Sequence, residues 1–227
     1  MSFSCKYCNK SYVRESTLTA HLCEPKRRWQ QQNEPSVQIA FKTYLRFYEV
    51  TQGSARLKTY EDFIASQFYL AFVKFGRHCT AIRAINIGSF TDWLLKNNKK
   101  IDHWCKDSLY NEWLVQYIRK ESVQDAMERA IKEMQNYAND NSELEKNFAN
   151  YFKFGSTNRI CKHISDGRIS PWVVYNCDSG ISFLAGLNQE QITIIMPAID
   201  PDFWQQKFKD YLSDSEWIKH LLAKAGL

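Results

Sequence analysis

The sequence predicts a mainly α-helical protein. Beyond residue 36, apolar side chains recur at three- and four-residue spacing, the pattern of helices that bury one face. Eight glycines and five prolines are few for 227 residues, which argues against an all-β protein built on many tight turns. Ser, Thr, Asp or Asn precedes most of the periodic stretches, as expected for helix N-caps. We therefore expect an all-α domain over residues 37–227, with a sub-boundary near 138–142.

Cap signals define the starts of several expected helices. Thr59 with Asp62 and Ser122 with Asp125 have the spacing of capping boxes, and Asp200-Pro201 places an N-cap before a proline at the first helical position. We expect helices over residues 37–50, 59–75, 90–97, 107–118, 122–137, 142–152, 158–164, 188–196, 201–208 and 213–222. Residues 170–175 fit either a β-like segment or the first turn of a helix.

The N-terminal residues 1–24 have a different sequence pattern, that of a small metal-binding unit. Cys5 and Cys8 are separated by two residues, so that a tight turn presents two thiolates to one side of a metal ion. A helix over residues 14–22 would bring His21 over the same ion. Phe3, Tyr12 and Leu18 would supply the small apolar core that so short a unit otherwise lacks.

This pattern, Phe3-x-Cys5-x2-Cys8-x3-Tyr12-x5-Leu18-x2-His21, resembles the ββα zinc-finger family, in which two cysteines and two histidines hold the metal. The resemblance covers about a tenth of the chain. It implies two short strands, one helix and a bound Zn²⁺ ion, whose binding in isolated fingers contributes on the order of 10–16 kcal/mol to folding.

The fourth ligand departs from the family pattern. The family places it three to five residues after the first histidine, where this chain has Pro25, Lys26 and Arg27. Cys23 is the nearest candidate, although residues two apart on a helix face different directions. We expect Pro25 to end the helix near Leu22, so that Cys23 bends back to the metal. The alternative is a ligand borrowed from the helical domain: Cys79, His103 or Cys105.

Positive charge is concentrated beside the expected finger. Six of the chain's 30 basic residues and two of its 25 acidic residues lie in positions 1–28, so this segment carries most of the net charge of +5. Such a patch is suited to phosphate contacts. Residues 25–36 are polar, basic at their start and free of apolar periodicity, which indicates a linker; a short helix over residues 27–32 is the alternative.

Relatives of the finger that read DNA contact bases from around the start of their helix. The resemblance places Arg14, Thr17 and Ala20 at those positions, with Ser16 beside them, and arginine suits a guanine edge. Phosphate contacts are expected from the remaining basic residues of the segment: Lys10, Lys26, Arg27 and Arg28. One finger covers only about three base pairs, so sequence-specific reading by the finger alone is not expected.

Three classes of function fit these observations. The first is an accessory or regulatory factor that binds nucleic acid, DNA rather than RNA, through the finger and contacts a protein partner through the helical domain. The second is an adaptor whose finger contacts protein alone. The third is an enzyme of DNA or RNA metabolism with its site in the helical domain. The sequence lacks a glycine-rich phosphate loop, a nucleophile elbow and a His-Glu-x-x-His motif, so an enzyme is the least supported.

The remaining features concern location and origin. The chain has no run of 18 apolar residues, and its start is polar and cysteine-bearing, unlike a signal peptide. We expect an intracellular protein, in the cytoplasm, nucleoid or nucleus of the host cell, without membrane contact. The helical domain, in stretches such as AFVKFGRH and RISPWVVYN, resembles small uncharacterised proteins of large tailed bacteriophages, which implies no particular activity.

Overall fold

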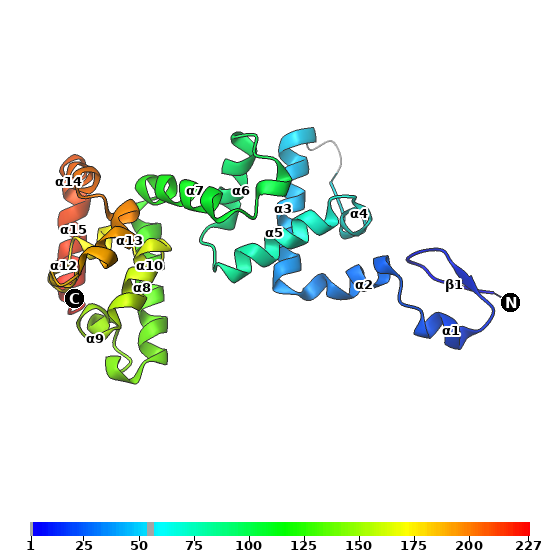
Figure 1. Ribbon diagram of the computed structural model, residues 1–227, viewed down its shortest axis with the longest axis horizontal. Helices are drawn as coiled ribbons and strands as arrows, with labels where there is room; N and C mark the ends of the chain where they lie inside the picture. The colour runs from blue at the N-terminus through cyan, green and yellow to red at the C-terminus, as the bar shows by residue number, and fades with distance from the viewer. Residues whose placement is uncertain (1, 54–56) are drawn as a thin grey trace. The chain divides into compact units, whose positions relative to one another are not determined.

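A computed structural model describes residues 2–53 and 57–227, so Met1 of the expected finger range lies outside the described residues. A small two-stranded sheet at the N-terminus precedes an all-helical body, which confirms the expected fold class (Figure 1). By packing, the chain divides into two compact units, residues 1–110 and 111–227. Contacts within the folded chain do not show which segments fold on their own. The expected domain ranges 1–24, 25–36 and 37–227 therefore stay a prediction.

The first unit begins with the antiparallel strands β1 and β2, in which Phe3 pairs with Tyr12 and Ser4 with Ser11. Its elements are β1 (Phe3–Ser4), β2 (Ser11–Tyr12), α1 (Glu15–Ala20), α2 (Glu24–Gln30), the 3-10 helix η1 (Gln31–Asn33), α3 (Pro35–Gln52), α4 (Tyr60–Ala65), α5 (Tyr69–Ala81), α6 (Ile87–Lys96) and η2 (Ile101–His103). Helix α7 (Asp107–Lys120) contains the boundary between the two units.

The core of the first unit is aromatic. Helices α3 and α5 make its most extensive contact, and Tyr44, Phe63, Phe72 and Phe75 are almost completely buried between them and their neighbours. Trp104 adds its ring edge-on to Phe75 at 5.4 Å between centroids, and its indole N–H donates to the Lys99 carbonyl. Edge-to-face rings of this kind stabilise a core beyond the area that they bury.

In the second unit, every element of regular secondary structure is a helix. Its elements after α7 are α8 (Val123–Asp140), η3 (Ser142–Leu144), η4 (Phe148–Asn150), α9 (Tyr151–Phe154), α10 (Thr157–Ser165), α11 (Pro171–Val174), α12 (Asp178–Ala185), α13 (Gln189–Ile199), α14 (Pro201–Asp210) and α15 (Leu212–Lys224). Trp172 and Trp204 are buried edge-to-face in its core, and the Trp204 indole N–H donates to the Ala198 carbonyl.

Local cap chemistry was predicted well. Thr59 and Asp62 form the expected capping box, and the hydroxyl of Ser122 accepts the Asp125 N–H. Asp200 accepts the Phe203 N–H in front of Pro201, and residues 171–174 adopt the helical alternative. Residues 24–33, where a linker and a short helix were both open, are helical.

Other helix limits were predicted wrongly. The helix expected over 59–75 is two helices, because the backbone is extended at Ser66. The helix expected over 142–152 is broken by left-handed backbone at Glu145 and Lys146. Helix α6 starts at Ile87 rather than Phe90, because Asn86 accepts the Ser89 N–H, and α15 starts at Leu212. Helix α13 continues past Pro197 to Ile199, so this proline lies in the last turn of the helix and does not end it.

The close approach of α3 and α5 depends on Gly76. A Cβ atom at this position would lie 2.0 Å from the carbonyl oxygen of Ser36 and 3.1 Å from the backbone nitrogen of Ala40. Backbone atoms of a buried helix cannot yield as a flexible side chain would. Gly76 therefore sets the distance between the two main helices of the first unit.

We predict that Gly76→Ala lowers the free energy of unfolding by about 3 kcal/mol or more, because the helices must separate. The matched control is Gly88→Ala in α6, where an added Cβ meets only the Asn86 side chain at 3.9 Å. That change should stabilise by about 0.5–1 kcal/mol through helix propensity. Urea unfolding followed by circular dichroism compares the two, and equal midpoints would contradict the packing described for α3 and α5.

Candidate metal centre

The hairpin of β1 and β2 places the first two cysteines. The Cys5 N–H donates to the Lys10 carbonyl at 2.9 Å, and the Asn9 N–H donates to the Cys5 carbonyl at 2.8 Å. Asn9 closes the turn in left-handed backbone, φ 57°, a conformation that asparagine tolerates better than most residues. This tight turn holds the Cys5 and Cys8 sulfur atoms within 4.8 Å of each other.

The other two side chains come from the segment that follows α1. Helix α1 ends at Ala20, and the backbone of its C-cap His21 is already extended, with φ −68° and ψ 123°. Cys23 is extended as well, with φ −82° and ψ 163°. In extended backbone residues two apart face the same side, so His21 and Cys23 point together while Leu22 between them is 59% exposed.

This geometry corrects the expected role of Pro25. Helix α1 is shorter than the expected range 14–22, and it ends five residues before this proline. Pro25 instead occupies the first turn of α2, where its missing N–H costs no hydrogen bond, and Cys23 is the N-cap of that helix. One residue therefore belongs both to the ligand group and to the start of the next helix.

Four ligand-type atoms gather at one point: the sulfurs of Cys5, Cys8 and Cys23 and a ring nitrogen of His21, all within 4.8 Å of one another. The Cys5 and Cys23 sulfurs are 3.8 Å apart, and the Cys8 sulfur lies 3.3 Å from His21 Nε2. A tetrahedral zinc ion with ordinary bond lengths requires about 3.8 Å between two sulfurs and about 3.6 Å between sulfur and nitrogen. The group therefore fits a tetrahedral metal ion.

The chemistry of the four donors also limits the choice of metal. Three thiols and one imidazole are soft or borderline ligands, which suit zinc and disfavour magnesium or calcium. The distance of 3.8 Å between Cys5 and Cys23 is far longer than a disulfide bond of about 2.05 Å, and all seven cysteines are free.

Backbone N–H groups of the turn point at the sulfur atoms. Hydrogen bonds from the Tyr7 N–H, and less strongly from the Cys8 N–H, lower the pKa of the buried Cys5 thiol. The Lys10 N–H acts in the same sense on Cys8, but burial and the neighbouring thiols of Cys23 and Cys5 outweigh it and raise the pKa of Cys8. These N–H groups would stabilise metal-bound thiolates.

The borrowed ligands considered from the sequence lie elsewhere. Among the described residues, Cys79, His103 and Cys105 are not part of the four-residue group. Cys79 is 1% exposed within α5, and burial raises the pKa of its thiol to about 12. Burial also raises the pKa of Cys105. Neither environment favours the thiolate that a metal requires.

Two aromatic residues that the sequence pattern does not single out connect this group to the helices. Tyr7, in the turn between Cys5 and Cys8, packs on Trp29 of α2 with 6.0 Å between ring centroids. Trp29 in turn contacts Tyr60 of α4 edge-on at 5.6 Å. A turn residue of the finger thus packs, through α2, on the helices of the first unit.

The finger has a partly buried core of its own. Tyr12 packs against the His21 ring, with 5.0 Å between centroids, and Phe3 and Leu18 are partly buried beside the strands and α1. Lys26 lies at the carboxyl end of α1, where its ammonium group donates to the carbonyls of His21 at 2.9 Å and Thr19 at 3.4 Å. A cation at the carboxyl end of a helix stabilises it, and here it also fixes the ligand segment.

The basic residues expected to bind nucleic acid fall into two groups. Lys10, Arg14 and Arg27 are exposed, as are Ser16 and Thr17 on α1. Lys26 and Arg28 are partly buried and engaged within the chain. The Arg28 guanidinium pairs with Glu24, donates to the Ile64 carbonyl and stacks 4.3 Å from the centre of the Tyr69 ring.

Comparison with protein families, with curated proteins and with solved structures finds no match for the chain. The resemblance of residues 3–23 to ββα zinc fingers therefore depends on the sequence pattern and on the geometry above. The comparisons lend no support to the resemblance of the helical domain to bacteriophage proteins. Among the described helices, none has the length and apolar character needed to cross a membrane.

We predict that Cys23→Ala sharply weakens zinc binding, because three donors remain where four are needed. Elemental analysis should find one zinc per wild-type chain, and competition with a chromogenic chelator measures the weakening in the variant. Cys105→Ala is the matched control and should bind as the wild type does. Full affinity in Cys23→Ala, or a loss confined to Cys105→Ala, would show that the fourth ligand is borrowed.

Proposed function

We propose that Cys5, Cys8, His21 and Cys23 hold a structural Zn²⁺ ion and that the finger formed in this way binds nucleic acid by its phosphate backbone. The observation that carries the proposal is the ligand group itself, since its four donors and their spacing fit zinc. The ion would supply the folding free energy that a unit with so few buried side chains lacks.

Three exposed basic residues support a phosphate-binding role. Lys10 lies at the end of the cysteine turn, Arg14 is the N-cap of α1, and Arg27 lies in α2. None of these three side chains makes an ion pair or a side-chain hydrogen bond within the described chain. Their charges are therefore available to an anionic partner, unlike those of Lys26 and Arg28.

Duplex DNA is the preferred partner in this proposal. A ββα finger inserts its helix into the major groove, which B-form DNA leaves wide and A-form RNA makes deep and narrow. Helix α1 is only six residues long, and its exposed Ser16 and Thr17 are small. We infer that binding depends on contacts with phosphates more than on contacts with bases. The protein would then act as an accessory factor whose position on the DNA is determined by something other than the finger.

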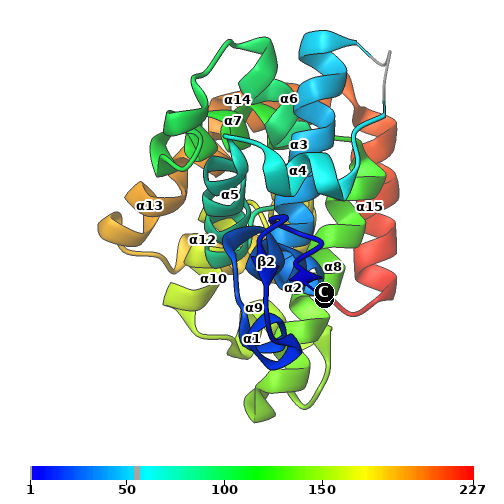
Figure 2. The same cartoon turned by 90° about the vertical axis from the view of Figure 1, so that its right-hand side faces the viewer.

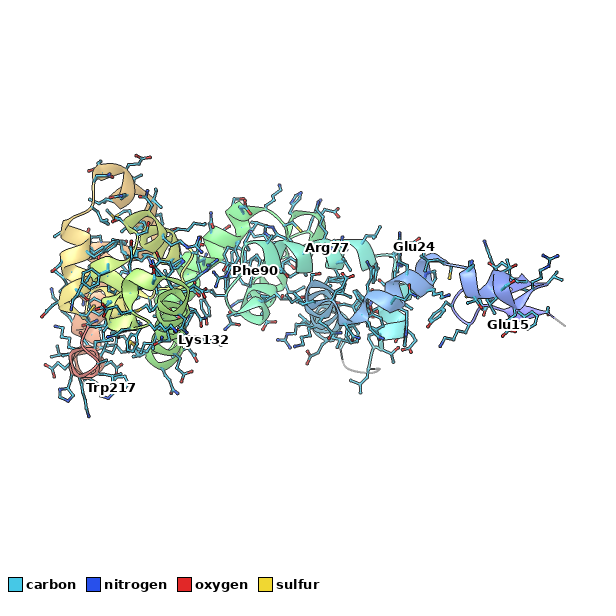
Figure 3. All side chains as sticks on the ribbon, turned by 90° about the horizontal axis from the view of Figure 1, so that it is seen from below. Glu15, Glu24, Arg77, Phe90, Lys132 and Trp217 are labelled. Atoms are coloured by element: carbon cyan, nitrogen blue, oxygen red, sulfur yellow. The ribbon has the colours of Figure 1, made fainter. Side chains whose placement is uncertain are left out.

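A protein partner is proposed for the second unit. Met127, Ile131, Trp217 and Leu221 line a groove of about 760 Å³ between α8 and α15, which lie side by side in Figure 2. Trp217 is 54% exposed there, and Figure 3 labels it on α15. An amphipathic helix laid between the two would bury the exposed Trp217 and Leu221, as in groove recognition generally.

We predict that Lys10→Ala with Arg14→Ala weakens DNA binding and reduces the salt slope of log affinity by about 0.9 for each phosphate that is no longer neutralised. Fluorescence anisotropy of a labelled duplex, titrated at several salt concentrations, measures both quantities. The charge-matched control is Lys219→Ala with Lys224→Ala, two exposed lysines of α15, which should leave the slope unchanged. An unchanged slope in the finger variant would favour the adaptor hypothesis instead.

We predict that Trp217→Ala abolishes capture of a protein partner by the second unit while DNA binding stays at the wild-type level. The measurement is a pull-down after nuclease treatment and at high salt, so that nucleic acid cannot bridge. Ile181→Ala, which removes another half-exposed apolar side chain from the same unit, is the control. A partner retained equally by both variants would refute the role of the groove.

A further inference from the structure

The groove between α8 and α15 has a polar rim with one charge of each sign. Glu128 and Lys132, one helical turn apart on α8, both line the groove. The other polar side chains that line it are amides, so the rim has no net charge. A strongly acidic or strongly basic partner would therefore gain little electrostatic attraction from this surface.

The two charges of the rim are not used within the chain. Both side chains are exposed, and although they are one turn apart on α8 they form no ion pair with each other. The Glu128 carboxylate accepts a hydrogen bond from the Gln124 side-chain amide at 2.9 Å. Lys132 makes no ion pair within the described part of the chain. Both charges are thus available to a partner that lies in the groove.

The apolar part of the groove is exposed as well. Trp217 is 54% exposed and Leu221 is 37% exposed, and both come from one face of α15. Ile131 lies opposite them on α8 and is partly buried. Tryptophan is among the residues that contribute most to protein interfaces when a partner covers it. Lys132 and Trp217 are both labelled in Figure 3.

A second copy of α8 in antiparallel orientation matches the order of these side chains. If a twofold axis passes at the level of Ala130, Glu128 lies opposite Lys132 of the partner subunit, and the reciprocal pair forms on the other side of the axis. The same symmetry places Gln124 opposite Asn136 of the partner subunit, where two amides can hydrogen-bond. A parallel pairing in register would instead place like charges opposite each other. An acid that precedes a base by one turn therefore favours an antiparallel copy of the same helix.

The apolar side chains fit the same symmetry. Ile131 is one residue from the level of the axis, so its two copies meet close to the centre of the interface. Trp217 and Leu221 border the groove on the α15 side, and a second α8 laid along it would cover them. The result is an apolar centre with an ion pair on each side, the usual arrangement of a protein interface.

We propose that a second copy of this chain occupies the groove, forming a symmetric dimer through α8 and α15. The proposal rests on the proposed function only in that the groove is a protein-binding surface, and it requires neither zinc nor nucleic acid. A dimer would also bring two fingers to one nucleic acid, and two linked binding modules bind more tightly than either alone.

Reversal of one charge at a time tests this symmetry directly. Glu128→Lys places two lysines opposite each other on both sides of the axis, and Lys132→Glu places two glutamates there. Neither variant should dimerise well with itself. An equimolar mixture of the two restores opposite charges in both pairs, so the mixed dimer should form. A partner other than this chain would not produce this recovery.

Sedimentation velocity of the full-length protein, over a series of concentrations and in reducing buffer, measures the dissociation constant. We expect a dimer in the wild type, a dissociation constant raised at least about tenfold in each single variant, and near wild-type association in the mixture. Lys209→Glu, which reverses an exposed charge on α14 outside the groove, is the control and should match the wild type. Circular dichroism verifies that each variant is folded.

Two results would overturn the dimer: a wild type that stays monomeric at every concentration, or a mixture that associates no better than the single variants. Capture of another protein that depends on Trp217, by a monomeric wild type, would leave the proposed function intact. Conversely, a dimer that responds to the charge reversals in a protein that binds no duplex would refute the proposed nucleic-acid role and support the dimer.

Discussion

The first unit depends on a single local constraint: the chain leaves helix α1 at Ala20 and runs extended from His21 to Cys23. Because alternate residues of extended backbone face one side, two ligands separated by one residue reach the same point. On a continued helix they would diverge. Lys26 holds the segment by donating to the His21 carbonyl, so the shape of the ligand group is fixed by hydrogen bonds as well as by any bound ion.

The same segment joins the finger to the helices that follow. Cys23 is both a member of the ligand group and the N-cap of α2, and α2 is held by Trp29 against Tyr60 and by Arg28 against Ile64 and Tyr69. A finger tethered by a flexible linker would explore many orientations before binding. This arrangement instead places the basic residues of the finger and of α2 on one connected unit, which favours their joint use on one polyanion.

Much of the fold was predictable because its signals are local. The capping boxes at Thr59 and Ser122, the Asp200-Pro201 start and the spacing of Cys5, Cys8 and His21 each lie within a few residues. Contacts between residues that are distant in sequence could not be predicted in this way. The sequence marks Arg28 only as a basic residue suited to phosphate, and it does not reveal that the guanidinium donates to the carbonyl of Ile64, 36 residues away.

The proposed role of the finger depends above all on the proposed zinc site, whose coordination shell can be measured without any substitution. X-ray absorption at the zinc edge of the purified protein reports the number and type of donor atoms. We expect three sulfurs at about 2.3 Å and one nitrogen at about 2.0 Å, with no oxygen. Two sulfurs with two nitrogens or oxygens would contradict the assignment of Cys23 and, with it, the link between the finger and α2.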